Sequence, residues 1–317
     1  MVESRSPYLT RASVKRKCTK EEEARKAAEK KMMELGDEVQ EAGVVVLPSE
    51  ELTLLEDVEE AEIRLIHLLH SAEWLDQYEA TTLVRQLVLF HRDNKFVVTH
   101  LTDIFETIKY SVESLRSAQS RNALFCICDL FQHFEDKDAL VQNVASLLNS
   151  LVIKGTNEKR FIAQAGEEAI ETIVTSAPSA QVLNALLEFS SSKSTKICAL
   201  VAKYSLLCLN GIAAQHKLKS FVADDRKVLP LIRGFTDLES SRSVQAKKPA
   251  HAALKLIASA MEGKAFEALV KKELSPVDAS RVISMVKQGS KPKEARSASL
   301  REMMAKQRQT MARTNGI

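Results

Sequence analysis

The feature that most constrains this chain is a polar turn that recurs about every 40 residues between apolar helical stretches. From Leu52 to about Met285, apolar residues recur at spacings of three and four, the pattern of amphipathic helices. The turns inside successive helix pairs are centred near residues 74, 117, 157, 193 and 240, at intervals of 43, 40, 36 and 47 residues. This is the period of HEAT and armadillo repeats, with one shorter unit. A single hairpin cannot bury its own apolar face, so hairpins of this kind stack on one another. The pattern predicts an all-α, HEAT-like helical-repeat solenoid of about six helical hairpins.

Composition supports helices over sheets. The 317 residues include only 9 glycines and 7 prolines, too few for the tight turns that a sheet protein needs. Aromatic residues make up 5%, and smaller aliphatic side chains fill the interior instead. The alternative to a solenoid is a compact all-α domain without repeats.

The chain divides into four predicted parts. Residues 1–18 read as a disordered basic arm, and residues 19–47 as a charged helix followed by a linker. In that helix Thr19 is a plausible N-cap and Gly43 a stop signal. Residues 48–286 form the repeat domain, in which 263–286 resemble an atypical final pair. Residues 287–317 are a basic tail.

Charge is distributed unevenly along these parts. Residues 48–286 hold 27 basic and 31 acidic side chains, whereas residues 287–317 hold 8 basic and 2 acidic ones. Residues 1–20 hold 6 basic and 1 acidic. Basic ends on a nearly neutral body favour an anionic polymer or surface as partner. The other interpretation is a pair of solvated tails without a target.

The residue types that support catalysis or metal binding are not arranged for it. The sequence holds no phosphate-binding glycine loop, nucleophile elbow or paired-carboxylate motif, and its seven histidines lack the spacing of zinc sites. We therefore expect no enzyme, no cofactor, no metal site and no small-molecule substrate. The five cysteines form no C-x-x-C pair and are interpreted as small core residues in a reducing compartment. They are Cys18, Cys126, Cys128, Cys198 and Cys208.

The sequence also predicts a soluble, intracellular protein. Its first 20 residues have no apolar core like that of a signal peptide, and no run of 18 apolar residues indicates a membrane span. Nucleic acid is an unlikely partner, because the body is mildly acidic and aromatic residues do not alternate with the basic runs.

The turns inside the helix pairs carry the functional signal. A solenoid presents such turns along one edge, because they recur once per repeat. The first turn carries the only tryptophan, Trp74, and the later four are basic. Taken singly, a tryptophan at a helix start is commonly a packing residue, and turn cations are commonly just solvated. Together they form a line of cations with an apolar anchor, which suits an acidic protein surface. The candidate binding residues are Trp74, Arg116, Lys159, Arg160, Lys193, Lys196, Arg242 and Lys247.

Trp74, followed by SLRSAQSRNALFCICDLF, NEKRFIAQAGEEAIETIV and SSKSTKICALVAKYSLLCL, resembles a TOG domain, closest to the CLASP and crescerin-type branch. The resemblance covers roughly residues 50–285. It implies a paddle of six HEAT repeats that binds the αβ-tubulin heterodimer. It also implies that Trp74 packs on β-tubulin with Arg116, Lys159 and Arg160 beside it, and that the remaining four basic residues reach towards α-tubulin.

One segment departs from that family. TOG domains follow the tryptophan with a basic residue and then an arginine, whereas this chain has Leu75, Asp76 and Gln77. The departure predicts a weaker tubulin contact at the first turn, or a different partner.

The leading hypothesis is therefore a non-enzymatic protein that binds tubulin or microtubules through its turn edge, with the basic tails assisting on the lattice. The alternative is a HEAT- or armadillo-type scaffold that holds another protein without tubulin affinity. The resemblance implies a place in the cytoplasm on the cytoskeleton, including a cilium, flagellum or basal body.

Overall fold

The computed structural model describes residues 44–92, 94–261 and 263–288. The predicted basic arm, the whole predicted charged helix and all but the first two residues of the basic tail lie outside these ranges, so those boundaries stay predictions. The chain divides into two compact units, Met1–Val45 and Val46–Ile317, and the helices named below belong to the second.

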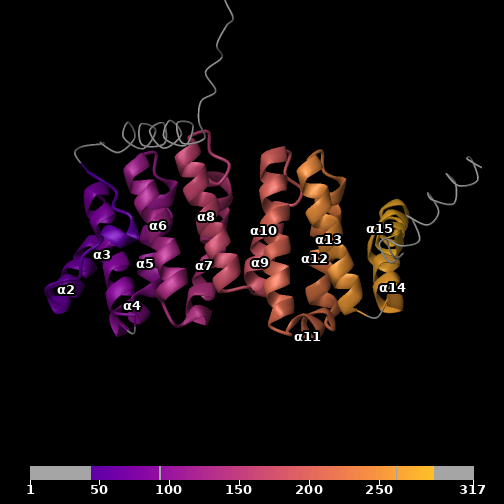
Figure 1. Ribbon diagram of the computed structural model, residues 1–317, viewed down its shortest axis with the longest axis horizontal. Coiled ribbons are helices and arrows are strands. Elements are labelled where there is room, and N and C mark those ends of the chain that lie inside the picture. The colour runs from indigo at the N-terminus through magenta and orange to yellow at the C-terminus, as the bar shows by residue number, and fades with distance from the viewer. Residues whose placement is uncertain (1–43, 93, 262, 289–317) are drawn as a thin grey trace, which may run out of the picture. The chain divides into compact units, whose positions relative to one another are not determined.

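Six helical hairpins follow one another along the second unit (Figure 1), which confirms the predicted HEAT-like solenoid. The first helices of the hairpins pack on one another in order and form the A layer. They are α2 (Val58–Leu69), α5 (Leu101–Glu113), α7 (Lys137–Lys154), α9 (Ala180–Leu187), α12 (Asp225–Ser240) and α14 (Gly263–Glu273). The second helices do the same and form the B layer. They are α3 (Trp74–Phe90), α6 (Ser117–His133), α8 (Arg160–Ser176), α10 (Thr195–Ala214), α13 (Val244–Ala260) and α15 (Pro276–Gln288).

Three short helices complete the described chain. The 3₁₀ helix η1 (Ser49–Glu51) precedes the first hairpin. The helices α4 (Lys95–Thr99) and α11 (Leu218–Val222) connect one hairpin to the next, at the lower ends of the helices in Figure 1. The turns inside the hairpins therefore lie at the opposite ends of the helices, which we call the turn edge.

Local sequence sets where the first helices begin. The first hairpin begins at Val58 rather than at Leu52, because the Asp57 carboxylate accepts the backbone N–H of Glu60 at 3.0 Å and caps the helix there. In the same way Asn94 Oδ1 accepts the backbone N–H of Val97 at 3.1 Å and caps α4, which meets α5 at His100.

The core lies between the two layers and is continuous from Ala61 to Val282. It holds mainly leucine, isoleucine, valine and alanine, as the composition predicted. The four cysteines within the described ranges are free and buried, which confirms their interpretation as core residues. Burial raises the pKa of the Cys128 and Cys208 thiols to about 12, so both stay protonated and unreactive at neutral pH.

Helix α10 is long and apolar enough, by length and composition, to cross a membrane. It is the one such helix within the described part of the chain, and half of its most apolar window is buried inside the fold. It packs on α8, α9 and α13, and its buried residues join the common core. These contacts are those of a core helix of the solenoid.

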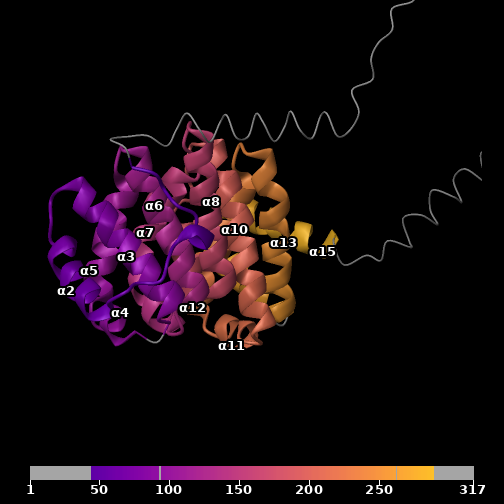
Figure 2. The same cartoon turned by 60° about the vertical axis from the view of Figure 1, so that its left-hand side comes forward.

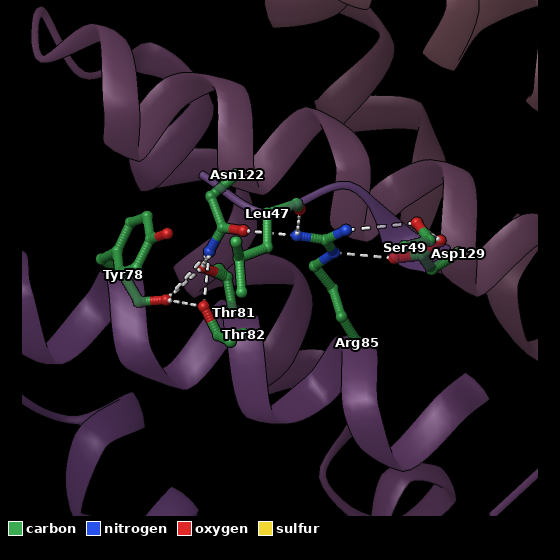
Figure 3. Close-up of polar contacts among 8 residues, drawn as sticks. All are labelled: Leu47, Ser49, Tyr78, Thr81, Thr82, Arg85, Asn122 and Asp129. Atoms are coloured by element: carbon green, nitrogen blue, oxygen red, sulfur yellow. Dashed lines mark hydrogen bonds and ion pairs between the residues drawn. The ribbon is translucent and has the colours of Figure 1, made fainter. Parts of the chain in front are cut away.

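A buried arginine joins the first two hairpins to the segment before them (Figure 3). The Arg85 side chain is fully buried, and its Nε donates to Asp129 Oδ2 at 2.7 Å. Its Nη1 donates to the backbone oxygen of Leu47 and to Asn122 Oδ1, both at 2.8 Å, and its Nη2 donates to Ser49 Oγ at 3.1 Å. Ser49 in turn donates to Asp129 Oδ1 at 2.6 Å. Arg85 thus fastens η1 and the residues before it to α3 and α6. Figure 2 shows the ribbon of α3 and α6 turned by 60° from the view of Figure 1.

Candidate functional site

The five turns share one local structure. In each, a serine or asparagine side chain accepts the backbone N–H of the residue two positions later, at 2.9 to 3.3 Å. This side-chain turn reverses the backbone without glycine. The five acceptor residues are Ser71, Ser114, Asn157, Ser192 and Ser241.

The shared turn places every following helix in the same register. The residue whose N–H is accepted is the N-cap of the B-layer helix, and the helix begins at the next residue. The N-termini of five B-layer helices therefore face the turn edge, and their unpaired N–H groups add partial positive charge to it. By this register Arg116 and Lys159 are N-caps, while Lys193 and Arg242 are the tip residues between acceptor and N-cap.

The first two turns touch each other through Trp74. The guanidinium of Arg116 lies over the indole ring of Trp74, 4.6 Å from its centroid. Trp74 is half-buried and Arg116 is exposed, so the stack forms a flat surface with a cation on its outer side. The structure brings together these two predicted residues from helices α3 and α6.

Two of the three residues that depart from the TOG pattern, Asp76 and Gln77, are held by contacts inside the fold, whereas Leu75 is exposed. The Asp76 carboxylate accepts the Ser71 hydroxyl at 2.6 Å. Gln77 is buried, donates to the backbone oxygen of Ser71 at 3.0 Å and accepts from Gln119 Nε2 at 2.7 Å. Asp76 and Gln77 therefore build the first turn and its contact with α6.

The third turn is bound directly to the second. Lys159 Nζ donates to Ser117 Oγ at 2.7 Å, and Lys154 Nζ donates to the backbone oxygen of Ser114 at 2.9 Å. Arg160 follows Lys159 as the first residue of α8 and is exposed. The lysine chains span the two turns, so the positive charge of the third turn has a fixed position beside the Trp74 stack.

A close backbone contact fixes the third turn from the other side. Gly155 ends α7, and a Cβ added at Gly166 of α8 would lie 2.7 Å from the Gly155 nitrogen and 3.0 Å from the Lys154 carbonyl carbon. Since both atoms belong to backbone, only the absence of a side chain at Gly166 lets the turn approach α8.

Gly166→Ala is therefore expected to lower the free energy of unfolding by about 1–3 kcal/mol, the usual cost of overpacking. In an open helix the same change is favourable by roughly 0.5–1 kcal/mol. Gly263→Ala is the matched control, because a Cβ there would have open space around it. Urea unfolding followed by circular dichroism measures both, and equal midpoints for the two variants would contradict the contact.

The fourth and fifth turns continue the edge. Their predicted residues, Lys193, Lys196, Arg242 and Lys247, are all exposed. The two turns are neighbours, since the helices that follow them, α10 and α13, pack against each other. Lys196 also lines a groove of about 520 Å³ together with Asn157 of the third turn and Gln245 of α13.

The same edge also carries exposed apolar residues that were not predicted from the sequence. Leu115, the tip residue of the second turn, is 96% exposed, and Val244, the first residue of α13, is 82% exposed. Leu75 and Ile153 are exposed near the first and third turns. An apolar residue between polar turn residues, as in ESLRS, is the signal that could have identified Leu115.

The turn edge is thus mixed in chemistry. Cations predominate from the second turn onward, apolar side chains stand out between them, and two carboxylates, Glu73 and Glu158, are also exposed. In the part of the chain that the structure describes, no group of three histidine, cysteine, aspartate or glutamate side chains is placed to hold a metal. The arrangement is suited to contact with a large surface rather than to enclosing a small molecule.

Comparison with known proteins gives two curated relatives. The chain is 28% identical over 122 residues to TOG array regulator of axonemal microtubules protein 1 of Mus musculus, and 25% identical over 122 residues to the protein of that name from Homo sapiens. Each match covers 38% of this chain and 7% of the relative, so the chain spans a small part of these proteins. No family model matches the chain.

The solved structures whose backbones align with this chain include helical-repeat proteins. One, described as "TOG-tubulin binding specificity promotes microtubule dynamics and mitotic spindle formation", has a TM-score of 0.45 and 14% identity over 85% of this chain and 98% of that one. A designed armadillo repeat protein has a TM-score of 0.36 and 15% identity over 70% of this chain and 98% of that one. At such TM-scores the assignment of the fold rests on the six hairpins themselves.

Proposed function

We propose that this chain, whose HEAT repeats resemble a TOG domain, is a non-enzymatic protein that binds tubulin through its turn edge. The curated relatives confirm the resemblance to TOG domains. The observation that carries the proposal is the continuous edge itself, in which the Trp74–Arg116 stack lies beside Lys159 and the later cationic turns. Asp76 is engaged with Ser71, so the departure from the family pattern does not aim a carboxylate at the partner.

The chemistry of the edge favours an acidic protein partner of large area. Exposed arginine and lysine side chains steer an anionic partner and form charge-assisted hydrogen bonds with its carboxylates. The flat aromatic stack and the exposed Leu115 add apolar contact area, which is where interfaces concentrate their binding energy. Tubulin is acidic and offers such a surface. The curated relatives in mouse and human are named as regulators of axonemal microtubules, which supports a cilium or flagellum as the location we propose.

The basic tail is assigned an assisting role in this proposal. Residues 287–317 hold 8 basic and 2 acidic side chains. A linked cationic segment raises the local concentration of the edge at an anionic lattice, and salt screens that effect. The tail thus adds weak, salt-sensitive attraction to a contact that the turn edge specifies.

Two measurements on the full chain test the proposal together. Cosedimentation with microtubules reports binding to the lattice, and gel filtration with free tubulin reports binding to the heterodimer. We expect comigration in at least one of them at physiological salt. Absence of binding in both would leave the scaffold alternative, in which the same edge holds another protein.

Leu115→Asp tests whether the exposed tip of the second turn lies in the tubulin contact. The side chain is 96% exposed, so the change should alter stability by no more than about 0.5 kcal/mol. It should weaken tubulin binding about tenfold, because a carboxylate then faces an acidic partner. The matched control is Val98→Asp in α4, which is 47% exposed and lies at the other ends of the helices. Equal affinities for the two variants would remove Leu115 from the contact.

A further inference from the structure

A second surface is a groove along the B layer, which meets the turn edge at Asn157, Arg160 and Lys196. Three hollows of about 460, 930 and 520 Å³ follow one another across α3, α6, α8, α10 and α13. Neighbouring hollows share lining residues: Gln132 and Glu168 belong to the first and second, and Glu167 and Lys203 to the second and third. They therefore form one elongated groove, which we call the B groove.

The middle of the B groove carries an excess of carboxylates. Glu167, Glu168 and Glu171 of α8 line it, against two cations, Arg160 at the start of α8 and Lys203 of α10. Lys203 Nζ lies 3.5 Å from Glu167 and 4.0 Å from Glu171, so one ammonium is shared by two carboxylates. Glu168 is exposed beside them.

A buried phenol holds two of these carboxylates in place. The Tyr204 hydroxyl lies 3.1 Å from Glu167 Oε2 and 3.3 Å from Glu171 Oε2, and Lys203 Nζ donates to it at 2.8 Å. Burial, together with the two carboxylates, raises the pKa of Tyr204, so the phenol stays protonated and available as a donor. The negative charge of the groove is therefore fixed before anything binds.

We propose that the B groove binds the chain's own basic C-terminal tail, residues 289–317, as an extended segment. The tail holds 7 basic and 2 acidic side chains, which complements the acidic middle of the groove. The described chain ends at Gln288 in α15, and α15 packs on α13 at one end of the B layer.

The tail is long enough for this path. Three steps between neighbouring helices, from α15 through α13 and α10 to α8, amount to roughly 30 Å at about 10 Å per step. At about 3.3 Å per residue, ten residues of extended chain cover that distance. The later basic residues, Arg301, Lys306 and Arg308, can then lie over the carboxylates of α8. This inference rests on the lining of the groove and not on the proposed tubulin contact, but a tail held in the groove is not free to assist at the lattice.

Tryptic cleavage of the tail in the full chain tests this inference. The variant is Gln132→Lys/Gln164→Lys/Glu168→Lys, which makes the groove cationic at exposed positions and leaves the Tyr204 network intact. At low salt we expect tryptic cleavage at Arg301 and Lys306 to be about fivefold faster in this variant than in the unchanged protein. The matched control, Glu106→Lys/Gln142→Lys/Gln181→Lys, places the same charges on exposed positions of the A layer and should cleave at the unchanged rate.

Cross-linking checks where the tail binds and whether the bound tail belongs to the same copy of the chain. Carbodiimide cross-linking of the unchanged protein should join tail lysines to Glu167 or Glu168, and dilution should not reduce the yield. Cross-links that disappear on dilution would show a tail from a second copy. Equal cleavage rates in all three proteins, or cross-links only to A-layer carboxylates such as Glu106, would overturn the proposal.

Discussion

Replacing Arg85 with leucine is expected to lower the free energy of unfolding by about 3–5 kcal/mol, the largest effect of any single change considered for this chain. Arg85 is fully buried, and its partner Asp129 is 2% exposed. Leucine removes the cation that is paired with the Asp129 carboxylate and leaves that charge uncompensated in the core. It also removes the donors that hold Leu47 and Ser49, so the segment with η1 should detach from α3 and α6.

Thermal unfolding followed by circular dichroism measures this effect. A loss of this size corresponds to a fall of roughly 10 °C in Tm for a domain of this length. The double variant Arg85→Leu/Asp129→Leu is the informative control, because removing both charges is often nearly neutral. If the single and double variants unfold at the same temperature, the cost comes from lost packing and not from the stranded carboxylate.

The second large effect concerns binding. Lys159→Glu/Arg160→Glu should weaken tubulin binding by well over tenfold, because it places two carboxylates beside the Trp74–Arg116 stack, facing an acidic partner. It should also break the Lys159–Ser117 hydrogen bond between the third and second turns. Gel filtration with free tubulin, at matched salt, gives the comparison.

The control for this variant uses the other ends of the helices. Lys217→Glu/Lys219→Glu changes the net charge by the same amount at exposed positions around α11. If both double variants lose affinity equally, net charge alone governs binding and the turn edge has no special role. If neither does, the tubulin contact lies elsewhere on the chain.

The solenoid was predictable because its signal repeats. The turns recur once per hairpin, so an error at one boundary, such as the Leu52 start of the first helix, did not affect the count of repeats. The true start of that helix is set by one hydrogen bond, in which Asp57 caps the helix. The spacing of apolar residues does not predict such a capping contact.

The candidate site was predictable only in part, because the direction of a side chain depends on contacts across repeats. The sequence places Trp74 and Arg116 in successive turns, and their stacking follows from the register of α3 and α6. It does not show that Asp76 faces Ser71 instead of solvent. No local pattern identifies Arg85 as a buried ion-pair residue, because its partners Asp129 and Leu47 are 44 and 38 residues away.

The shared structure of the turns has a consequence for how such an edge can change over time. A serine or asparagine at one position and a backbone N–H two residues later are sufficient to form each turn. The tip residue between them makes no contribution to that hydrogen bond, and it differs at every turn: Ala72, Leu115, Glu158, Lys193 and Arg242. Substitution at a tip can therefore alter recognition in one repeat while leaving the solenoid intact. A surface built this way can exchange one partner for another in single, independently tolerated steps.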